Sequence, residues 1–364
     1  MDNLEANEAI RTELKGFYGL MKSMDEYLRF VFYTGVTKFS KISIFSDLNQ
    51  PNDISLAEDY AEICGISEKE LLHNFQPEIS LMAEKRELTV EQTLTKLKQC
   101  YDGYHFAENS AGMYNPFSLL NAFFKLSFDY YWYQTGTPSF LVKMIASGEM
   151  DIRDLKNDVY VDKLQLNDYK SGVNDPVPIL YQSGYLTIKN YIPEENAYIL
   201  GYPNEEVKYG FMRNLADEFI PYTHLSPTNF SAIMFTRDLR TGNVDGFMTR
   251  LKSRFASIPY DLTDRTERSY QLGFYLIFEL MGQYVETEVK SARGRADVVV
   301  KTKDAIFVFE FKMDKNATAE DALRQIDEKG YLIPYTADKR KLIKTGVEIS
   351  AKERGISRWI VVES

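Results

Sequence analysis

The sequence lacks the segments that membrane-spanning and secreted proteins need. No apolar run approaches the ~20 residues that a membrane-spanning helix requires. The stretch MDNLEANEAIRTELKGFYGL at the start is acidic and amphipathic, and it has neither the basic beginning nor the apolar centre of a secretory signal. We therefore expect no membrane partner and no export.

Cysteine and histidine are also scarce. The two cysteines, Cys64 and Cys100, are too few for a disulfide framework and form no CxxC pair, so a cytoplasmic location with reducing conditions fits. The three histidines, His73, His105 and His224, are scattered along the chain, which argues against a histidine-based zinc site.

Basic residues are outnumbered by acidic ones, and the formal net charge is −10. This balance argues mildly against a protein that coats nucleic acid nonspecifically. It does not exclude an enzyme that meets phosphates through a metal ion and a local basic patch.

Apolar and aromatic residues, by contrast, are abundant. The 364 residues are 44% hydrophobic and 26% charged, which is the balance of a soluble globular protein. At roughly 150 residues per domain this length predicts two or three domains. The 25 tyrosines and 23 phenylalanines are interpreted first as core and interface packing.

The first part of the chain, residues 1–150, is expected to be mostly helical. Apolar positions recur at helical spacing through residues 5–32. The run from Leu28 to Tyr33, at the end of that segment, predicts a buried strand that enters a Thr-Gly turn.

Two further helical segments follow in this part. Residues 53–80 predict two short helices broken at Gly65, the second with Ser67 as N-cap and Glu70 as its capping-box partner. Residues 118–128 predict another helix, which the Asn-Pro pair of NPF opens.

The middle part, residues 151–262, combines helices with a hairpin. Within residues 176–204 a short helix leads to SGYLTIKNY, a PEEN turn and AYILGYPN, an order that resembles a winged-helix module. Any α/β element with a hairpin would give the same pattern, and winged helices dock proteins as often as they read DNA, so no DNA role is assigned from it. Residues 206–260 predict helices again.

The last part, residues 263–364, predicts a small α/β domain because helices and strands alternate within it. A helix over 266–281 precedes a strand over 283–290, two more strands over 296–301 and 305–312, a helix over 317–330 and a final strand over 357–363. The fold class expected for the whole chain is therefore α/β in several domains.

The two central strands of this part have the signature of a β-hairpin. ADVVV and IFVFEF are rich in Val, Ile and Phe, and KTKDA separates them. A turn centred on Lys303-Asp304 would place Val300 opposite Phe307, and Val298 opposite Phe309. The same register would place Asp297 opposite Glu310, on a face that Glu310 shares with Lys312 because side chains alternate along a strand.

A carboxylate pair at this position calls for a cation. The second strand is apolar on both faces, which is typical of a central, covered strand. Buried carboxylates are costly unless they are paired or bind a metal, and two of them side by side repel. Two carboxylates suit Mg²⁺, which also binds substrate phosphate. Lys312 can then orient or deprotonate a water on the metal, or stabilise charge on the phosphate. The alternative is an ordinary ion pair between Glu310 and Lys312 at a strand end.

The motifs resemble a known superfamily. GRAD, followed after twelve residues by EFK and then by ALRQIDEKGY, resembles the PD-(D/E)xK nucleases. More specifically, it resembles the nuclease-like domain at the C-terminus of bacterial AAA-ATPase-like proteins of uncharacterised function. Those domains carry a Glu in the first helix, a GR-x-D motif, an E-F-K motif and a Q-I-x-x-K-x-Y helix. The matching residues are Glu267, Gly294-Arg295, Asp297, Glu310, Phe311, Lys312, Gln325, Lys329 and Tyr331. The sequence departs from the family at Gln271, where a His is expected, so no base is assigned there.

The resemblance extends upstream. FYTGVTKFSKISIFSDLNQPNDIS, LKQCYDGYHF, YNPFSLL and YWYQTGTPSFL resemble the second half of that family's AAA-ATPase-like domain, whose phosphate-binding loop lies before them. This chain contains no GxxxxGK[ST], so we expect neither ATP binding nor ATP hydrolysis from it. The simplest hypothesis is that Met1 begins a truncated gene product. ATP turnover above background would contradict this expectation.

The candidate site residues follow from the motifs and the resemblance together. The catalytic candidates are Asp297, Glu310, Lys312, Gln325 and Glu267; the substrate-binding candidates are Arg295 and Tyr331; and the metal ligands are Asp297, Glu310 and the carbonyl of Phe311. Gln325, on a helix packed over the sheet, could hold Lys312 or a phosphate, or it could face solvent. Two others have simpler explanations: Glu267 is also favoured by the helix dipole, and Tyr331 could be core. Glu288 is a further acidic candidate. Asp102, His105 and Asn115 look constrained, and a turn-forming role is at least as good for them.

The function expected is Mg²⁺- or Mn²⁺-dependent hydrolysis of phosphodiester bonds in nucleic acid, with DNA favoured as the partner. A homo-oligomer is compatible with the sequence. The alternative is a nuclease fold without activity, which would serve as a binding or regulatory module of a larger AAA-ATPase-like protein. The two differ in metal binding between Asp297 and Glu310.

Overall fold

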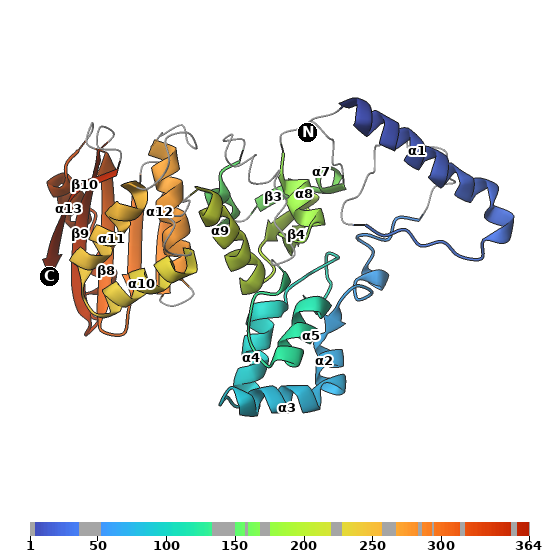
Figure 1. Ribbon diagram of the computed structural model, residues 1–364, viewed down its shortest axis with the longest axis horizontal. Helices are drawn as coiled ribbons and strands as arrows, with labels where there is room; N and C mark the ends of the chain where they lie inside the picture. Colours follow the sequence, from blue (N-terminus) through green and yellow to red (C-terminus); the bar gives the residue numbers. More distant parts are fainter. Residues whose placement is uncertain are drawn as a thin grey trace. The chain divides into compact units, whose positions relative to one another are not determined.

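The computed structural model combines helices and sheets in two compact units (Figure 1). Unit 1 comprises residues 1–136 and 147–208, and unit 2 comprises residues 137–146 and 209–364. The residues that the structure describes are 4–35, 52–132, 150–156, 159–167, 175–219, 228–256, 267–282, 286–292, 295–313, 317–350 and 355–363. Within these stretches no helix combines the length and the apolar character that crossing a membrane requires.

Unit 1 begins with helix α1 (Leu4–Ser23), which the short helix η1 (Asp25–Tyr27) follows. The predicted helix is confirmed at its start but ends well before residue 32. The predicted strand from Leu28 to Tyr33 is wrong, because these residues form no strand and Phe30 leaves 80% of its surface exposed. A strand needs a neighbour to bond its N–H and C=O groups, and none of the described strands pairs with this segment.

Four helices build the first core of unit 1. They are α2 (Glu68–Asn74), α3 (Gln76–Lys85), α4 (Val90–Tyr101) and α5 (Pro116–Lys125). Each contributes a fully buried apolar side chain, namely Leu71, Met82, Tyr101 and Leu119 in that order. The short helix η2 (Glu58–Tyr60) and the two-residue strands β1 (Ile66–Ser67) and β2 (Met113–Tyr114) lie in the connections.

The predicted helix starts at Ser67 and Asn115 are confirmed by their caps, whereas the helix expected before Gly65 is only the three-residue η2. The backbone N–H of Ser67 donates to the Glu70 carboxylate at 2.9 Å, and the Glu70 N–H donates to the Ser67 hydroxyl at 3.3 Å, which is the capping box. α5 begins at Pro116, and the side-chain oxygen of Asn115 caps it by accepting the Ser118 N–H at 3.2 Å.

The rest of unit 1 contains a small antiparallel sheet. Its elements are η4 (Ile152–Lys156), β3 (Val159–Asp162), α7 (Lys163–Asn167), α8 (Val177–Gln182), β4 (Thr187–Ile192) and β5 (Ala197–Gly201). The strand order is β3-β5-β4. The predicted hairpin is confirmed, since β4 and β5 pair antiparallel around the PEEN turn, where Asn196 adopts φ 50°. Asn tolerates this left-handed backbone better than most residues.

Unit 2 is a mixed sheet with helices on both faces. After α9 (Glu205–Phe219), which begins in unit 1, its elements are α10 (Thr228–Arg240), α11 (Val244–Ala256), α12 (Glu267–Met281), β6 (Glu286–Ala292), β7 (Arg295–Lys301), β8 (Ala305–Met313), α13 (Ala319–Glu328), η5 (Ile333–Tyr335), β9 (Lys341–Ser350) and β10 (Gly355–Glu363). The strand order is β10-β9-β8-β7-β6, with β8 and β9 parallel and the other pairs antiparallel.

The central position of β8, predicted from its two apolar faces, is confirmed. Phe309 contacts Phe247 of α11 and Phe278 of α12, with ring centroids 5.3 and 5.7 Å apart. On the opposite face, Ile306 and Val308 pack with Val299 of β7 and Ile326 of α13. Helices therefore cover β8 from both sides, which fixes its backbone in the middle of the domain.

The division of the chain differs from the boundaries drawn on the sequence. Helices α10 and α11 fall in the segment 151–262 that was separated from the last domain, yet they belong to unit 2. Phe247 of α11 shows why, because its ring packs on the central strand β8. The strand β9 was not predicted, and its Gly346 and two lysines, Lys341 and Lys344, weaken the strand pattern.

Candidate active site

Glu310 and Lys312 lie near the end of β8 and contact each other. Glu310 has no exposed surface, and 17% of the Lys312 side chain is exposed. The Lys312 ammonium donates to Oε1 of Glu310 at 2.7 Å. The strand places both side chains on one face because they are two residues apart. The buried carboxylate of Glu310 is thus compensated by a lysine at the edge of the core.

Helix α13 brings a third side chain to this pair. The Lys312 ammonium also donates to Oε1 of Gln325, at 2.6 Å, and Nε2 of Gln325 donates to the Tyr331 hydroxyl at 3.4 Å. A capping box between Thr318 and Asp321 starts the helix. The amide oxygen of the half-buried Gln325 therefore faces Lys312, while its amide nitrogen faces Tyr331.

The hairpin register of β7 and β8 is confirmed as predicted. Val300 lies opposite Phe307 and Val298 lies opposite Phe309. Asp297 is the next residue of β7, and its partner on the other side is Lys290 of β6. The described pairs end at Val298 and Phe309. One more step of the same register would place Asp297 opposite Glu310, and the side chain of Asp297 lies outside what the structure describes. Its role stays a prediction.

The remaining predicted residues are placed in part. Tyr331 packs against the apolar cluster of β7, β8 and α13, as expected for a core residue, and its hydroxyl also accepts a hydrogen bond from Gln325. Glu267 is the first residue of α12, Arg295 the first of β7, and Glu288 lies opposite Val299 in β6. Their side chains, with that of Gln271, lie outside the described part of the chain.

The donors at this site suit a hard divalent cation. Glu310 supplies a buried carboxylate whose Oε2 is also hidden from solvent, and Phe311 supplies a backbone carbonyl between the two charged residues. Oxygen donors of this kind suit Mg²⁺ and Mn²⁺. Among the side chains that the structure describes, no three of the types His, Cys, Asp and Glu form a group that could hold a metal. Asp297, whose side chain is not among those described, therefore stays the predicted second ligand.

Two residues that the sequence did not single out lie on β9 beside the site. Gly346 is the register partner of Glu310, and Glu348 is the register partner of Lys312. The carboxylate of Glu348 accepts the Ala319 N–H, at the start of α13, at 3.3 Å. A glycine inside a strand often marks the place where another backbone approaches closely. Gly346 was therefore the residue of β9 from which this close approach could have been predicted.

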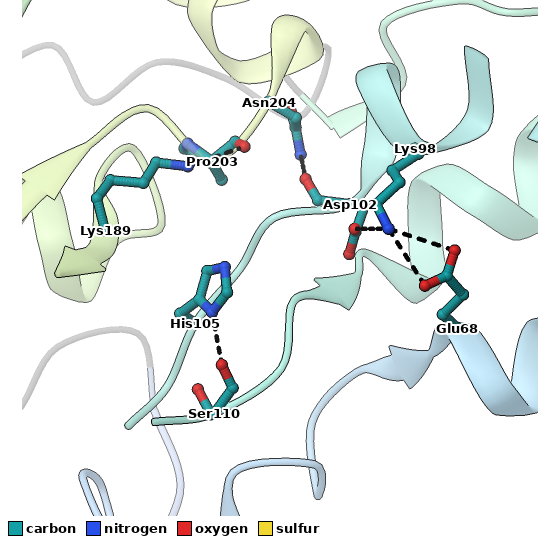
Figure 2. A network of polar contacts seen from close by, with 8 residues as sticks. All are labelled: Glu68, Lys98, Asp102, His105, Ser110, Lys189, Pro203 and Asn204. Atoms are coloured by element: carbon teal, nitrogen blue, oxygen red, sulfur yellow. Dashed lines mark hydrogen bonds and ion pairs between the residues drawn. The ribbon is translucent and has the colours of Figure 1, made fainter. Parts of the chain in front are cut away.

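Asp102 and His105 of unit 1, which the sequence marked as constrained, lie in a separate network of polar contacts (Figure 2). Asp102 ends α4 and is only 7% exposed, and its carbonyl accepts a hydrogen bond from the Asn204 amide at 3.0 Å. Its Oδ2 lies 4.0 Å from the ammonium of Lys98, which also pairs with Glu68 at 3.2 Å. Burial raises the pKa of the Asp102 carboxyl, while the Gly103 N–H and Lys98 act in the lowering direction.

The described contacts of His105 in this network all involve backbone groups, either its own or that of Ser110. Its N–H donates to the Thr187 hydroxyl of β4 at 2.7 Å, and that hydroxyl donates to the His105 carbonyl at 3.1 Å. Its Nδ1 lies 2.8 Å from the carbonyl of Ser110. Together with the cap that Asn115 forms, these contacts agree with a turn-forming and joining role for the segment.

Comparison with known proteins gives matches at both ends of the chain. Residues 265–359 match the model of the PD-(D/E)XK nuclease superfamily, and residues 1–45 match the model named Predicted AAA-ATPase. An uncharacterized protein in the vnfD 5′ region of Azotobacter chroococcum mcd 1 is 32% identical over 372 residues, which covers 99% of this chain and 69% of that protein. No solved structure gives a significant match.

Proposed function

We propose, from the premise that this chain belongs to the family that joins a predicted AAA-ATPase region to a C-terminal PD-(D/E)XK nuclease superfamily domain, that it is a metal-dependent nuclease. The reaction is hydrolysis of phosphodiester bonds in nucleic acid. The observation that carries the proposal is the contact of Lys312 with the buried Glu310 and with Gln325. An ordinary strand-end ion pair would not need an amide from a separate helix.

Each residue has a proposed part in the reaction. Asp297, Glu310 and the Phe311 carbonyl would hold Mg²⁺ or Mn²⁺. The bound cation supplies neutralisation of the phosphate charge. Lys312 positions the water that attacks phosphorus, and Gln325 keeps the ammonium in place by accepting a hydrogen bond from it. Lys312 can do this because an ammonium has three donors, of which Glu310 and Gln325 use two.

The proposal also gives parts to the outer residues of the site. Arg295 would meet a substrate phosphate, since guanidinium groups bind phosphate in two-point contacts. Tyr331 would contact substrate or hold the Gln325 amide, which its hydroxyl reaches at 3.4 Å. Glu267 would add a carboxylate from the start of α12.

The proposal extends to the substrate, the oligomeric state, the domain boundaries and the cellular compartment. DNA is the favoured substrate, and a homo-oligomer is compatible with it. The order β3, α7, α8, β4, β5 and the sheet order β3-β5-β4 support a winged-helix module in unit 1, with no DNA role assigned. A restriction-endonuclease-like core over 263–364, preceded by parts at 1–150 and 151–262, is the proposed domain plan, with α10 and α11 of the middle part packing in one compact unit with that core. The cytoplasm is the proposed compartment, from the cysteine usage.

The test is cleavage of plasmid, linear duplex, single-stranded DNA and structured RNA, with Mg²⁺ or Mn²⁺ and with EDTA. Lys312→Ala should lower the metal-dependent rate by at least about a hundredfold. Lys344→Ala is a matched control, because Lys344 is a strand lysine on β9 with 15% of its side chain exposed and a carboxylate partner, Asp327, at 2.6 Å. It should retain the rate.

Two results would contradict the proposal. Cleavage that survives Lys312→Ala would point to a contaminant or another site. Absence of cleavage on every substrate, together with absence of Mn²⁺ binding, would favour the silent regulatory module.

A further inference from the structure

We propose that Glu348 of β9 is a positioning residue for the nuclease site: it fixes the start of α13 and thereby sets the contact between Gln325 and Lys312. The inference rests on the proposed nuclease function. It concerns a residue that acts through the start of α13, and that thereby determines where Lys312 is held.

Glu348 joins the three elements that surround the site. Its Oε2 accepts the N–H of Ala319, the first residue of α13, at 3.3 Å. Its Oε1 accepts the hydroxyl of Ser357 in β10 at 3.2 Å. It is also the register partner of Lys312 on the neighbouring strand. A carboxylate at a helix N-terminus is favoured both by the free N–H groups and by the helix dipole.

Gly346 explains how α13 comes so close to the sheet. It is the register partner of Glu310, and a Cβ atom at this position would lie 2.2 Å from the Ala319 carbonyl oxygen. Only glycine fits there without a shift of the helix. Both backbone polar groups of Ala319 therefore meet β9: its carbonyl oxygen lies over Gly346, and its N–H donates to the carboxylate of Glu348.

The start of α13 controls Gln325 because the helix is stiff. Gln325 lies six residues after Ala319, which is a rise of about 9 Å at 1.5 Å per residue. A tilt or lift of the first turn moves Gln325 with it. The 2.6 Å contact between Gln325 and Lys312 does not tolerate such a movement.

A general loosening of α13 is the competing explanation, and the chain offers a control for it. Asp327, near the other end of the same helix, accepts two bonds from Lys344 of β9, at 2.6 and 2.7 Å. Asp327→Ala removes a polar contact between the same two elements as Glu348→Ala does. It leaves the helix start untouched.

The first test is a double-mutant cycle on the metal-dependent cleavage rate. Glu348→Ala and Gln325→Ala should each lower kcat by roughly tenfold, with KM within about twofold, since small misplacements of catalytic groups cost this much or more. The double variant should be no slower than the slower single variant, because both changes remove the same contact. Glu348→Gln keeps an acceptor for the Ala319 N–H and should restore most of kcat. Asp327→Ala should stay within about twofold of wild type.

Additive effects of Glu348→Ala and Gln325→Ala would overturn the inference, as would an equal loss in Asp327→Ala. A second readout does not depend on activity: the Lys312 ammonium signal in protein labelled with ¹⁵N-lysine, assigned by its loss in Lys312→Arg. Its proton exchange with water should become faster in both Glu348→Ala and Gln325→Ala, and stay unchanged in Asp327→Ala. This result without any cleavage by wild type would reject the nuclease and keep the positioning role. An unchanged signal in Glu348→Ala would reject the positioning role even if wild type cleaves.

Discussion

At the scale of the residue, Glu310 and Lys312 depend on each other. Glu310 is fully buried, and an ammonium 2.7 Å away compensates its charge. Removing one partner of a buried pair leaves the other charge uncompensated, which costs more than the pair itself contributes. These two residues could be paired from the sequence because strand alternation alone puts them on one face.

Lys312→Ala should therefore lower the free energy of unfolding of unit 2 by about 3 kcal/mol when EDTA is present. Lys344→Ala should cost less than about 1 kcal/mol, because its partner Asp327 is 57% exposed. Urea denaturation followed by Trp359 fluorescence, in a Trp132→Phe background, measures both. Equal losses in the two variants would show that the Glu310 pair has no special burial cost.

Asp102 should make the stability of unit 1 depend on pH. Burial raises the pKa of folded Asp102 above its ordinary 3.8, so the folded chain binds this proton more tightly. Its stabilising contribution is complete below pH 3.8 and is lost as the pH rises through the folded pKa. Asp102→Asn has no such loss, so its stability relative to wild type should increase from about pH 3.8 toward neutrality.

Glu108→Gln is the control of opposite sign. The Lys163 ammonium, bonded to Glu108 at 2.8 Å, lowers the pKa of that carboxyl below 4.5. The contribution of Glu108 is therefore present above pH 4.5 and is lost as the pH falls through the folded pKa, so the variant should lose relative stability as the pH rises. Trp132 fluorescence in a Trp359→Phe background follows both. A pH-independent difference for Asp102→Asn would contradict the burial argument.

At the scale of the element, local patterns predicted most boundaries but not the neighbours of a strand. The apolar run of β8 and the Ser67 cap were readable, because both depend on residues close in sequence. The contact of Gln325 with Lys312 was open, because it depends on how deep α13 lies on the sheet. The run from Leu28 to Tyr33 was misread, because a strand also needs a partner that the sequence pattern does not contain.

Gly346 tests the depth of α13 most directly. Gly346→Ala puts a Cβ 2.2 Å from the Ala319 carbonyl oxygen, so the helix must move away, at a cost of about 1–3 kcal/mol in unfolding free energy. Gly355→Ala is the matched control, since this strand glycine of β10 has its nearest atom, Cβ of Phe255, 4.0 Å from the added carbon. Urea denaturation of both variants compares them. Equal stability would mean that α13 is not seated as described.

At the scale of the whole molecule, the two units provide separate reporters. The chain has two tryptophans, Trp132 in unit 1 and Trp359 in unit 2. Lys312→Ala should shift the urea transition seen by Trp359 and leave the one seen by Trp132 in place. Compared in single-tryptophan backgrounds, an equal shift at both tryptophans would show that the units unfold as one.

The central claim, a divalent-cation site at the end of β8, is tested most directly by Mn²⁺ titration calorimetry. We expect one site per chain in wild type, and its loss in both Glu310→Gln and Asp297→Asn. Asp338→Asn, a carboxylate of unit 2 that Arg340 holds at a pKa of about 2, should bind as wild type does. Undiminished Mn²⁺ binding by Glu310→Gln, or no binding by wild type, would contradict the account.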